Sequence, residues 1–252
     1  MFKRISVIAI LVVSIFASCE DKKTSNEKNS ENTSKAVKNS TKNEDSAKTK
    51  IDSAKIENEE EKALTEKDTA FPIPQEQLIP FLTEYGKKNP ENKVRITTSF
   101  GAFEVTLYRD TPLHRANFIM LVKNDYFNQT YFHRVAENFV IQGGNSDNAS
   151  TNKKRHKIGD YLIPNELNAG HRHNRGAFSA AKYAEQNTSK ASSPFEFFVV
   201  LSPNGSHHLD DEHTVFGYVS KGMDVVDKIS KVKTGPSEWP IDNIEMQVEL
   251  ID

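Results

Sequence analysis

The chain has 252 residues, a formal net charge of −2 and a single cysteine. This charge balance gives no electrostatic basis for nucleic-acid binding, and a lone cysteine excludes a disulfide bond within the chain. All 11 glycines and all 10 prolines occur after residue 70. We therefore expect the structured part to start near Phe71, which leaves enough residues for one domain with a sizeable core.

The first residues of the chain predict a secretory signal. Lys3 and Arg4 precede an apolar run over residues 5–16, which is too short to span a bilayer as a mature helix. Two small residues then lead to Cys19, an arrangement that resembles the lipobox of bacterial lipoproteins. The resemblance implies a signal peptide over residues 1–18, lipidation of Cys19 and a lipid anchor in the membrane of a bacterial cell envelope. An ordinary signal peptide followed by an incidental cysteine is the alternative.

Residues 19–70 have a different composition. They are rich in Lys, Glu, Asn and Ser and contain no aromatic residue. Such a segment cannot bury enough apolar surface to offset the entropy lost on ordering, so we predict a disordered, charged tether. Residues 71–92 form a lead-in segment, in which a short helix over residues 80–87 is expected to end near Gly86.

Alternating apolar and polar residues predict strands in the remaining residues, 93–252. Phe103, Val105 and Leu107 alternate with more polar residues, so one face of their strand should be buried. Similar signals predict strands over residues 94–97, 197–201, 214–219 and 244–250. Helical spacing predicts helices over residues 222–230 and 111–124, the second capped by the hydroxyl of Thr111. Many short strands with two helices favour a mainly β fold, a closed barrel capped at its ends.

Residues 131–144 carry the most informative pattern, FHRV-x3-F-x2-QGG. Its spacing resembles the active-site segment of the cyclophilin-type peptidyl-prolyl isomerases. Other stretches extend the resemblance across residues 93–252, including "TSFGAFEVTLYRDTP", "FEFFVV" and "HHLDDEHTVFGYVSKGMDVV". The resemblance implies a closed eight-stranded antiparallel β-barrel capped by two α-helices, isomerase activity on X-Pro bonds and no cofactor.

The resemblance also assigns roles to individual positions. Arg134 matches the catalytic arginine, and Phe139 and Gln142 match further residues of the catalytic site. The positions that match the peptide-binding groove are Val140, Ala181, Lys182, Glu196, Phe198, His208, Leu209 and His213. Isomerisation requires only an apolar pocket for the proline ring and a hydrogen-bond donor directed at the twisting amide. A guanidinium group suits the second requirement because it stays charged and offers several donors.

Three of these positions depart from the family pattern. Glu196 stands where glutamine is usual and Lys182 where asparagine is usual. These opposite charges either form a local pair or weaken peptide binding. His208 stands where many eukaryotic members have tryptophan, which argues against tight cyclosporin binding without affecting isomerase activity. His133 precedes Arg134 on a predicted strand and should therefore point to the opposite face.

The same residues allow other interpretations. One alternative is that Arg134 is a structural residue of the barrel lid that pairs with a carboxylate. Another is that Phe139 and Phe198 are ordinary core residues. A binding module or assembly factor of the cell envelope would hold proline peptides in the same groove with negligible turnover. A surface adhesin would reuse the barrel. No metal is expected, because the spacing of the clustered histidines does not fit a zinc site. These histidines are His171, His173, His207, His208 and His213.

Together the two resemblances imply a peptidyl-prolyl cis-trans isomerase that is anchored in a bacterial cell envelope and faces either the periplasm or the outside. Its expected partners are proline-containing unfolded or loop segments of exported proteins, together with the membrane that holds the anchor. The sequence contains no heptad or other assembly pattern, which favours a monomer.

Overall fold

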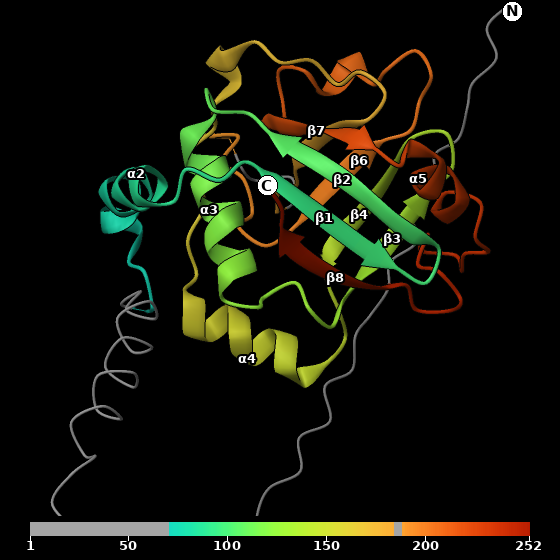
Figure 1. The fold of residues 1–252 in the computed structure, drawn as a ribbon, viewed down its shortest axis with the longest axis horizontal. Coiled ribbons are helices and arrows are strands. Elements are labelled where there is room, and N and C mark those ends of the chain that lie inside the picture. The colour runs from blue at the N-terminus through green and yellow to red at the C-terminus, as the bar shows by residue number, and fades with distance from the viewer. Residues whose placement is uncertain (1–70, 184–187) are drawn as a thin grey trace, which may run out of the picture. The chain divides into compact units, whose positions relative to one another are not determined.

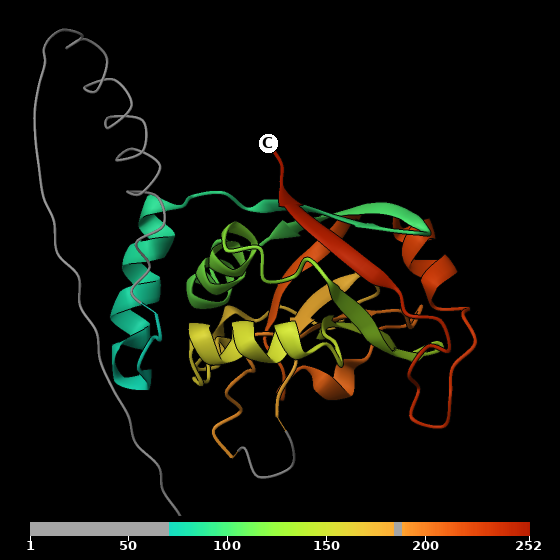
Figure 2. The ribbon, with the colours of Figure 1, turned by 90° about the horizontal axis from the view of Figure 1, so that it is seen from below.

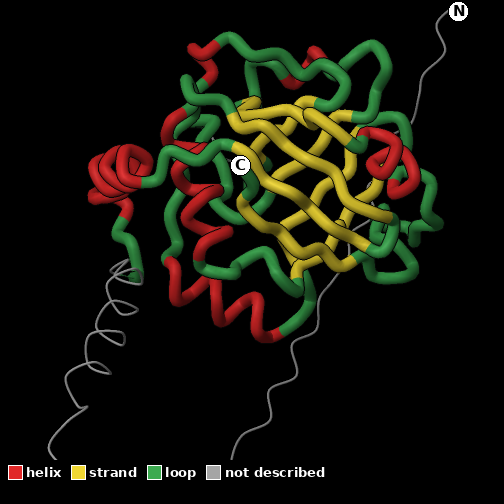
Figure 3. Tube along the Cα trace, viewed as in Figure 1, coloured by secondary structure: helices red, strands yellow, loops and turns green. Residues whose placement is uncertain are grey.

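Eight strands close into a barrel in the computed structural model of this protein, which describes residues 71–183 and 188–252 (Figures 1 and 3). The predicted signal peptide, Cys19 and the predicted tether lie outside the described residues. The strands are β1 (Lys93–Thr98), β2 (Gly101–Leu107), β3 (Thr130–Ala136), β4 (Val140–Asn145), β5 (Ala177–Ala180), β6 (Phe197–Val200), β7 (Val215–Lys221) and β8 (Glu245–Leu250).

The barrel is antiparallel throughout, with the strand order β1-β2-β7-β5-β6-β4-β3-β8. This confirms the closed eight-stranded barrel predicted from the sequence. Along β2, Phe103, Val105 and Leu107 are buried and the residues between them are not. Strand β6 is buried at every position, as its continuous apolar run predicts. Phenylalanine rings from several strands therefore fill the interior of the barrel.

Helices α3 (Pro112–Lys123) and α5 (Met223–Ile229) are the two capping helices predicted from the sequence. Figures 1 and 2 show them on opposite sides of the barrel. The described residues also form α2 (Leu78–Lys88) and α4 (Ala149–Ile158). Short 3-10 turns occur at η1 (Gln75–Gln77), η2 (Leu167–Ala169) and η3 (His207–Leu209). Within this part of the chain, no helix is long and apolar enough to cross a membrane.

The lead-in segment packs on the domain through α2. This helix spans Leu78–Lys88, so the short helix predicted over residues 80–87 is present, but it continues through Gly86 and does not end there. Gly86 is needed for close packing instead, because a Cβ atom there would lie 3.1 Å from the Cβ of Ala116 on α3. Arg115 reinforces the contact by donating an Nη2 hydrogen bond to the Gly86 carbonyl oxygen at 2.8 Å. Leu82 is fully buried in the main core.

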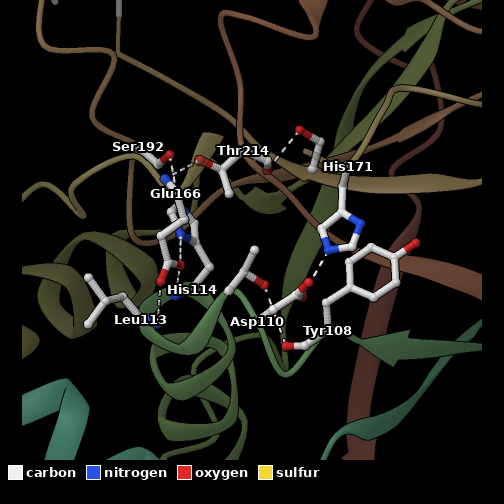
Figure 4. A network of polar contacts seen from close by, with 10 residues as sticks. Tyr108, Asp110, Leu113, His114, Glu166, His171, Ser192 and Thr214 are labelled. Atoms are coloured by element: carbon white, nitrogen blue, oxygen red, sulfur yellow. Dashed lines mark hydrogen bonds and ion pairs between the residues drawn. The ribbon is translucent and has the colours of Figure 1, made fainter. Parts of the chain in front are cut away.

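Helix α3 is capped by a residue distant in the sequence (Figure 4). The Thr111 side chain makes no capping hydrogen bond, contrary to the sequence-based expectation. The carboxylate of Glu166 accepts hydrogen bonds from the backbone N–H groups of Leu113 and His114, each at 3.0 Å. It also accepts one from His114 Nδ1 at 2.6 Å. Glu166 therefore satisfies two of the four backbone donors that a helix N-terminus leaves unpaired.

Candidate active site

Three neighbouring strands bring the central site residues into one row. Arg134 on β3 pairs in register with Gln142 on β4, and Gln142 pairs with Phe198 on β6. The β3–β4 register shifts between Phe132 and Arg134, so His133 is an extra residue in the ladder. A bulge of this kind redirects side chains, and His133 lies beside the site, 3.4 Å from the Glu196 carboxylate. His133 does not line the cleft itself, so it supports the site through Glu196.

An open cleft of about 230 Å³ lies over this row. It is lined by Arg134, Phe139, Val140, Gln142, Ala181, Lys182, Phe198, Leu209 and His213. The sequence predicted each of these residues for catalysis or peptide binding. The lining of the cleft combines apolar groups with a few polar ones, which is usual for a site that binds a small ligand or a peptide. The two remaining predicted residues, Glu196 and His208, are adjacent to the cleft.

Arg134 is held by a carboxylate from the loop between α5 and β8. Its Nε donates to Glu238 Oε2 at 2.7 Å. Its guanidinium carbon lies 5.8 Å from the centroid of the Phe139 ring, within cation–π range. The Arg134 side chain stays 38% exposed and lines the cleft. The guanidinium therefore combines an ion pair with access to a ligand.

The side-chain amide of Gln142 is oriented by a hydrogen bond to Glu196. Its Nε2 donates to Glu196 Oε2 at 2.9 Å, and Arg155 on α4 donates to Glu196 Oε1 at 3.0 Å. Burial by itself would raise the pKa of Glu196, but hydrogen bonding with His133 and the charge of Arg155 outweigh it and lower that pKa. Since a carboxylate only accepts hydrogen bonds, it selects the amide nitrogen of Gln142 and leaves the amide oxygen for other partners.

Lys182 and Glu196 do not form the local pair considered from the sequence. Lys182 Nζ contacts Glu212 Oε2 at 2.7 Å instead, and Lys190 Nζ contacts the other oxygen of Glu212 at 3.1 Å. These hydrogen bonds with two lysines lower the pKa of Glu212 to about 2. Both charged departures from the family pattern thus have partners elsewhere in the chain.

His213 presents a neutral ring at the edge of the cleft. Its Nδ1 lies 3.0 Å from the Ala180 carbonyl oxygen, so Nδ1 carries the proton and Nε2 is a free acceptor. Burial lowers the pKa of His213 to about 4, with Lys182 and His173 adding to the effect. His213 can therefore accept a hydrogen bond from a peptide at neutral pH.

The ring of Phe198 packs against a buried histidine. His173 stacks on Phe198 with ring centroids 5.7 Å apart. Its Nδ1 lies 2.9 Å from Asp210 Oδ1, and its Nε2 lies 3.0 Å from Ser179 Oγ. This arrangement has the order of a Ser-His-Asp hydrolase triad, but Ser179 is fully buried. A nucleophile must meet its substrate, so the network is structural.

His208 lies at the exposed edge of the cleft, next to Phe139. Its ring stacks on Phe139 with centroids 5.6 Å apart, and the residue is exposed on η3. Leu209, the next residue, lines the cleft. In residues 71–183 and 188–252, no group of three or more His, Cys, Asp or Glu side chains is arranged to hold a metal ion.

Sequence reasoning missed Glu238, Arg155 and His173. Glu238 is 104 positions from Arg134 and lies in a loop, and α4, which carries Arg155, has no apolar stripe. The sequence offered one signal, which was Glu196 itself. A buried carboxylate needs a positively charged partner, so a cation was to be expected near it.

A family model described as "Cyclophilin type peptidyl-prolyl cis-trans isomerase/CLD" matches residues 93–249. The chain is 36% identical over 170 residues to a peptidyl-prolyl cis-trans isomerase of Acinetobacter baylyi, covering 63% of this chain and 86% of that protein. It is 30% identical over 162 residues to the isomerase CYP18-2 of Arabidopsis thaliana, covering 64% and 94%.

Solved structures lead to the same family. A cyclophilin-type isomerase of Cryptosporidium parvum superposes with a TM-score of 0.56 and 25% identity, covering 64% of this chain and 98% of that one. A second structure of that protein, in the presence of the dipeptide Ala-Pro, has a TM-score of 0.54 with 26% identity and covers 64% and 99%. The fold, the cleft and the family match agree, and the chain belongs to the cyclophilin-type peptidyl-prolyl cis-trans isomerases.

Proposed function

We propose that Arg134 catalyses the isomerisation by donating a hydrogen bond to the nitrogen of the twisting prolyl amide. We propose further that the substrates are prolines in unfolded or loop segments of exported proteins. The observation that supports the role of Arg134 is its position in one row with Gln142 and Phe198, at an open and partly apolar cleft.

The chemistry of the peptide bond explains why such a donor would accelerate the reaction. The bond has partial double-bond character, and its rotation barrier is about 18–20 kcal/mol. As the bond twists, the nitrogen lone pair is no longer delocalised and becomes a hydrogen-bond acceptor. A donor placed there stabilises the twisted state more than either planar state, as catalysis requires.

The other residues of the cleft suit a proline ring. Phe139, Phe198 and Leu209 provide apolar surface, and Gln142 and His213 provide acceptors for the peptide backbone. A Cryptosporidium parvum relative was solved in the presence of the dipeptide Ala-Pro. This relative supports a short X-Pro segment as the ligand of the cleft.

The role of Arg134 is tested with an unfolded protein whose refolding is limited by proline isomerisation, a step that takes about 10–100 s without a catalyst. The full-length wild-type protein should shorten this slow phase. An Arg134→Ala variant that is still folded should lose about 10²–10³-fold in catalytic rate, as when one oxyanion-hole donor is removed. Equal acceleration by both proteins would contradict the role of Arg134. Binding of the unfolded protein without acceleration by the wild type would favour the binding module.

The envelope location depends on the sequence before the domain. The basic residues, the short apolar run and Cys19 support export and lipidation. Expressed in a bacterium, the wild-type chain should fractionate with membranes and carry an acylated N-terminal Cys19. A Cys19→Ala variant should lose the acyl chains. An unmodified cysteine in the mature wild-type protein would show that the signal is an ordinary one.

A further inference from the structure

The loop between α5 and β8 lies against the strand that carries Arg134. The backbone N–H of Val135 on β3 donates to the Glu238 carbonyl oxygen at 2.8 Å. The loop is also tied to itself: Gly235 N–H donates to the Trp239 carbonyl oxygen at 2.8 Å, and Glu238 N–H donates to the Gly235 carbonyl oxygen at 3.1 Å. Glu238 thus occupies a fixed position in a tight turn next to the active site.

The backbone of Glu238 adopts a conformation that glutamate disfavours. Its φ angle is 61°, in the left-handed region where glycine or asparagine is preferred. Non-glycine residues in this region cost conformational free energy and tend to occur at functional sites. Because glycine would relieve this cost, we expect the glutamate side chain to have a function.

The Glu238 side chain makes its contact with Arg134. Its Oε2 accepts the Nε hydrogen bond at 2.7 Å, and the two side chains are 45% and 38% exposed. An ion pair this exposed contributes little to folding stability. Stability therefore does not explain the residue, whereas orientation does. The guanidinium carbon of Arg134 lies 5.8 Å from the centroid of the Phe139 ring. Because a guanidinium is a rigid plane, a hydrogen bond that fixes Nε on one side also restricts the directions of the Nη donors.

We propose that Glu238 is a positioning residue for isomerisation. It holds Arg134 through Nε and leaves the Nη donors free for the prolyl amide nitrogen in the cleft. The inference rests on the proposed role of Arg134. Glu238 itself does not touch the substrate, so its effect should appear in the rate of rotation within the complex rather than in the binding of the peptide.

Two substitutions test the proposal in the full-length protein. Glu238→Gly removes the carboxylate and also relieves the backbone strain, so the variant should fold at least as stably as the wild type. Its kcat for a short Ala-Pro peptide should fall about tenfold, because small losses of alignment have large effects on rate, and its KM should stay within about twofold. Glu238→Gln keeps an oxygen that can accept from Nε and should restore most of the loss.

The matched control is Glu249→Gln. Glu249 also forms an exposed ion pair with an arginine, Arg95, at 3.0 Å, but the pair lies on β1 and β8 outside the cleft. Its kcat and KM should equal those of the wild type. The single tryptophan, Trp239, follows Glu238, so its fluorescence checks that the loop is intact in each variant. If Glu238→Gly failed to fold, Glu238→Asn would replace it, since asparagine tolerates the same backbone region.

A double variant distinguishes the role of Glu238 from the role of Arg134. In Arg134→Ala, the further change Glu238→Gly should have no effect on kcat, because the group that Glu238 positions is absent. A tenfold loss in that background too would overturn the proposal, as would a wild-type kcat for Glu238→Gly. If Arg134→Ala itself kept the wild-type rate, the proposed function would fail first, and this inference with it.

Discussion

At the scale of single residues, His213 gives the clearest pH dependence. An unperturbed histidine has a pKa of about 6.5, and burial lowers the pKa of His213 to about 4. Between these two values the unfolded chain binds a proton that the folded chain does not. The free energy of unfolding must therefore fall as the pH falls from about 6.5 to about 4, and this contribution is fully present only above pH 6.5.

Replacing His213 with Asn should remove this contribution. The Asn amide can still donate to the Ala180 carbonyl oxygen, which His213 Nδ1 contacts at 3.0 Å. Urea unfolding of both proteins at pH 7, 5.5 and 4 should show that the wild type loses on the order of 2 kcal/mol more than the variant. Parallel losses of stability in the two proteins would show that His213 titrates with an unperturbed pKa.

At the scale of elements, the ends of the helices show what the sequence could and could not predict. The start of α3 near Pro112 was predicted correctly, but the cap was assigned to Thr111. Glu166 performs that function from more than 50 positions further along the chain (Figure 4). Local patterns predict where a helix begins, because propensity and proline are local properties. They do not reveal a cap that the tertiary fold supplies.

The cap leads to a prediction about stability. Glu166→Ala should lower the free energy of unfolding by about 2–3 kcal/mol, because it leaves two backbone donors and His114 Nδ1 without their acceptor. Thr111→Val should cost less, since the Thr111 hydroxyl makes only a 3.5 Å contact with the Tyr108 carbonyl oxygen. Chemical denaturation of the two variants checks the order. A larger loss for Thr111→Val would restore the sequence-based assignment.

Helix α2 allows a similar test of the lead-in segment. Leu82 is fully buried in the main core, whereas Ile79 on the same helix is 52% exposed. Leu82→Ala should lower the free energy of unfolding by about 2–4 kcal/mol, and Ile79→Ala should change it by no more than about 0.5 kcal/mol. If both substitutions were neutral in urea unfolding, α2 would not be part of the cooperative domain in solution.

At the scale of the whole molecule, the barrel follows from patterns that the sequence displays openly. Alternation in β2 and β8, and the apolar run of β6, reflect the burial of one or both faces. Helix α4 could not be predicted in this way, because only Thr151 and Ile158 are buried along it. Its contacts with the domain include Ile158, which is part of the main core, and Arg155, which donates to Glu196 Oε1 at 3.0 Å.

The cleft was predicted more fully than its support. Its lining residues lie in motifs of the family, so matching positions in the sequence was enough to name them. The residues that hold them, Glu238 and Arg155, come from a loop and from a polar helix. Their partners are set by the closure of the barrel, which brings together segments that are far apart in the chain.

The central claim is that Arg134 acts on the twisted state of the prolyl amide rather than on peptide binding. The most direct measurement is the NMR exchange rate between cis and trans forms of a short Ala-Pro peptide, together with its Kd, for the full-length wild type and Arg134→Ala. We predict a Kd that changes by less than about threefold and an exchange rate that falls by about 10²-fold or more. An Arg134→Ala protein that is folded and exchanges the peptide at the wild-type rate would contradict the account.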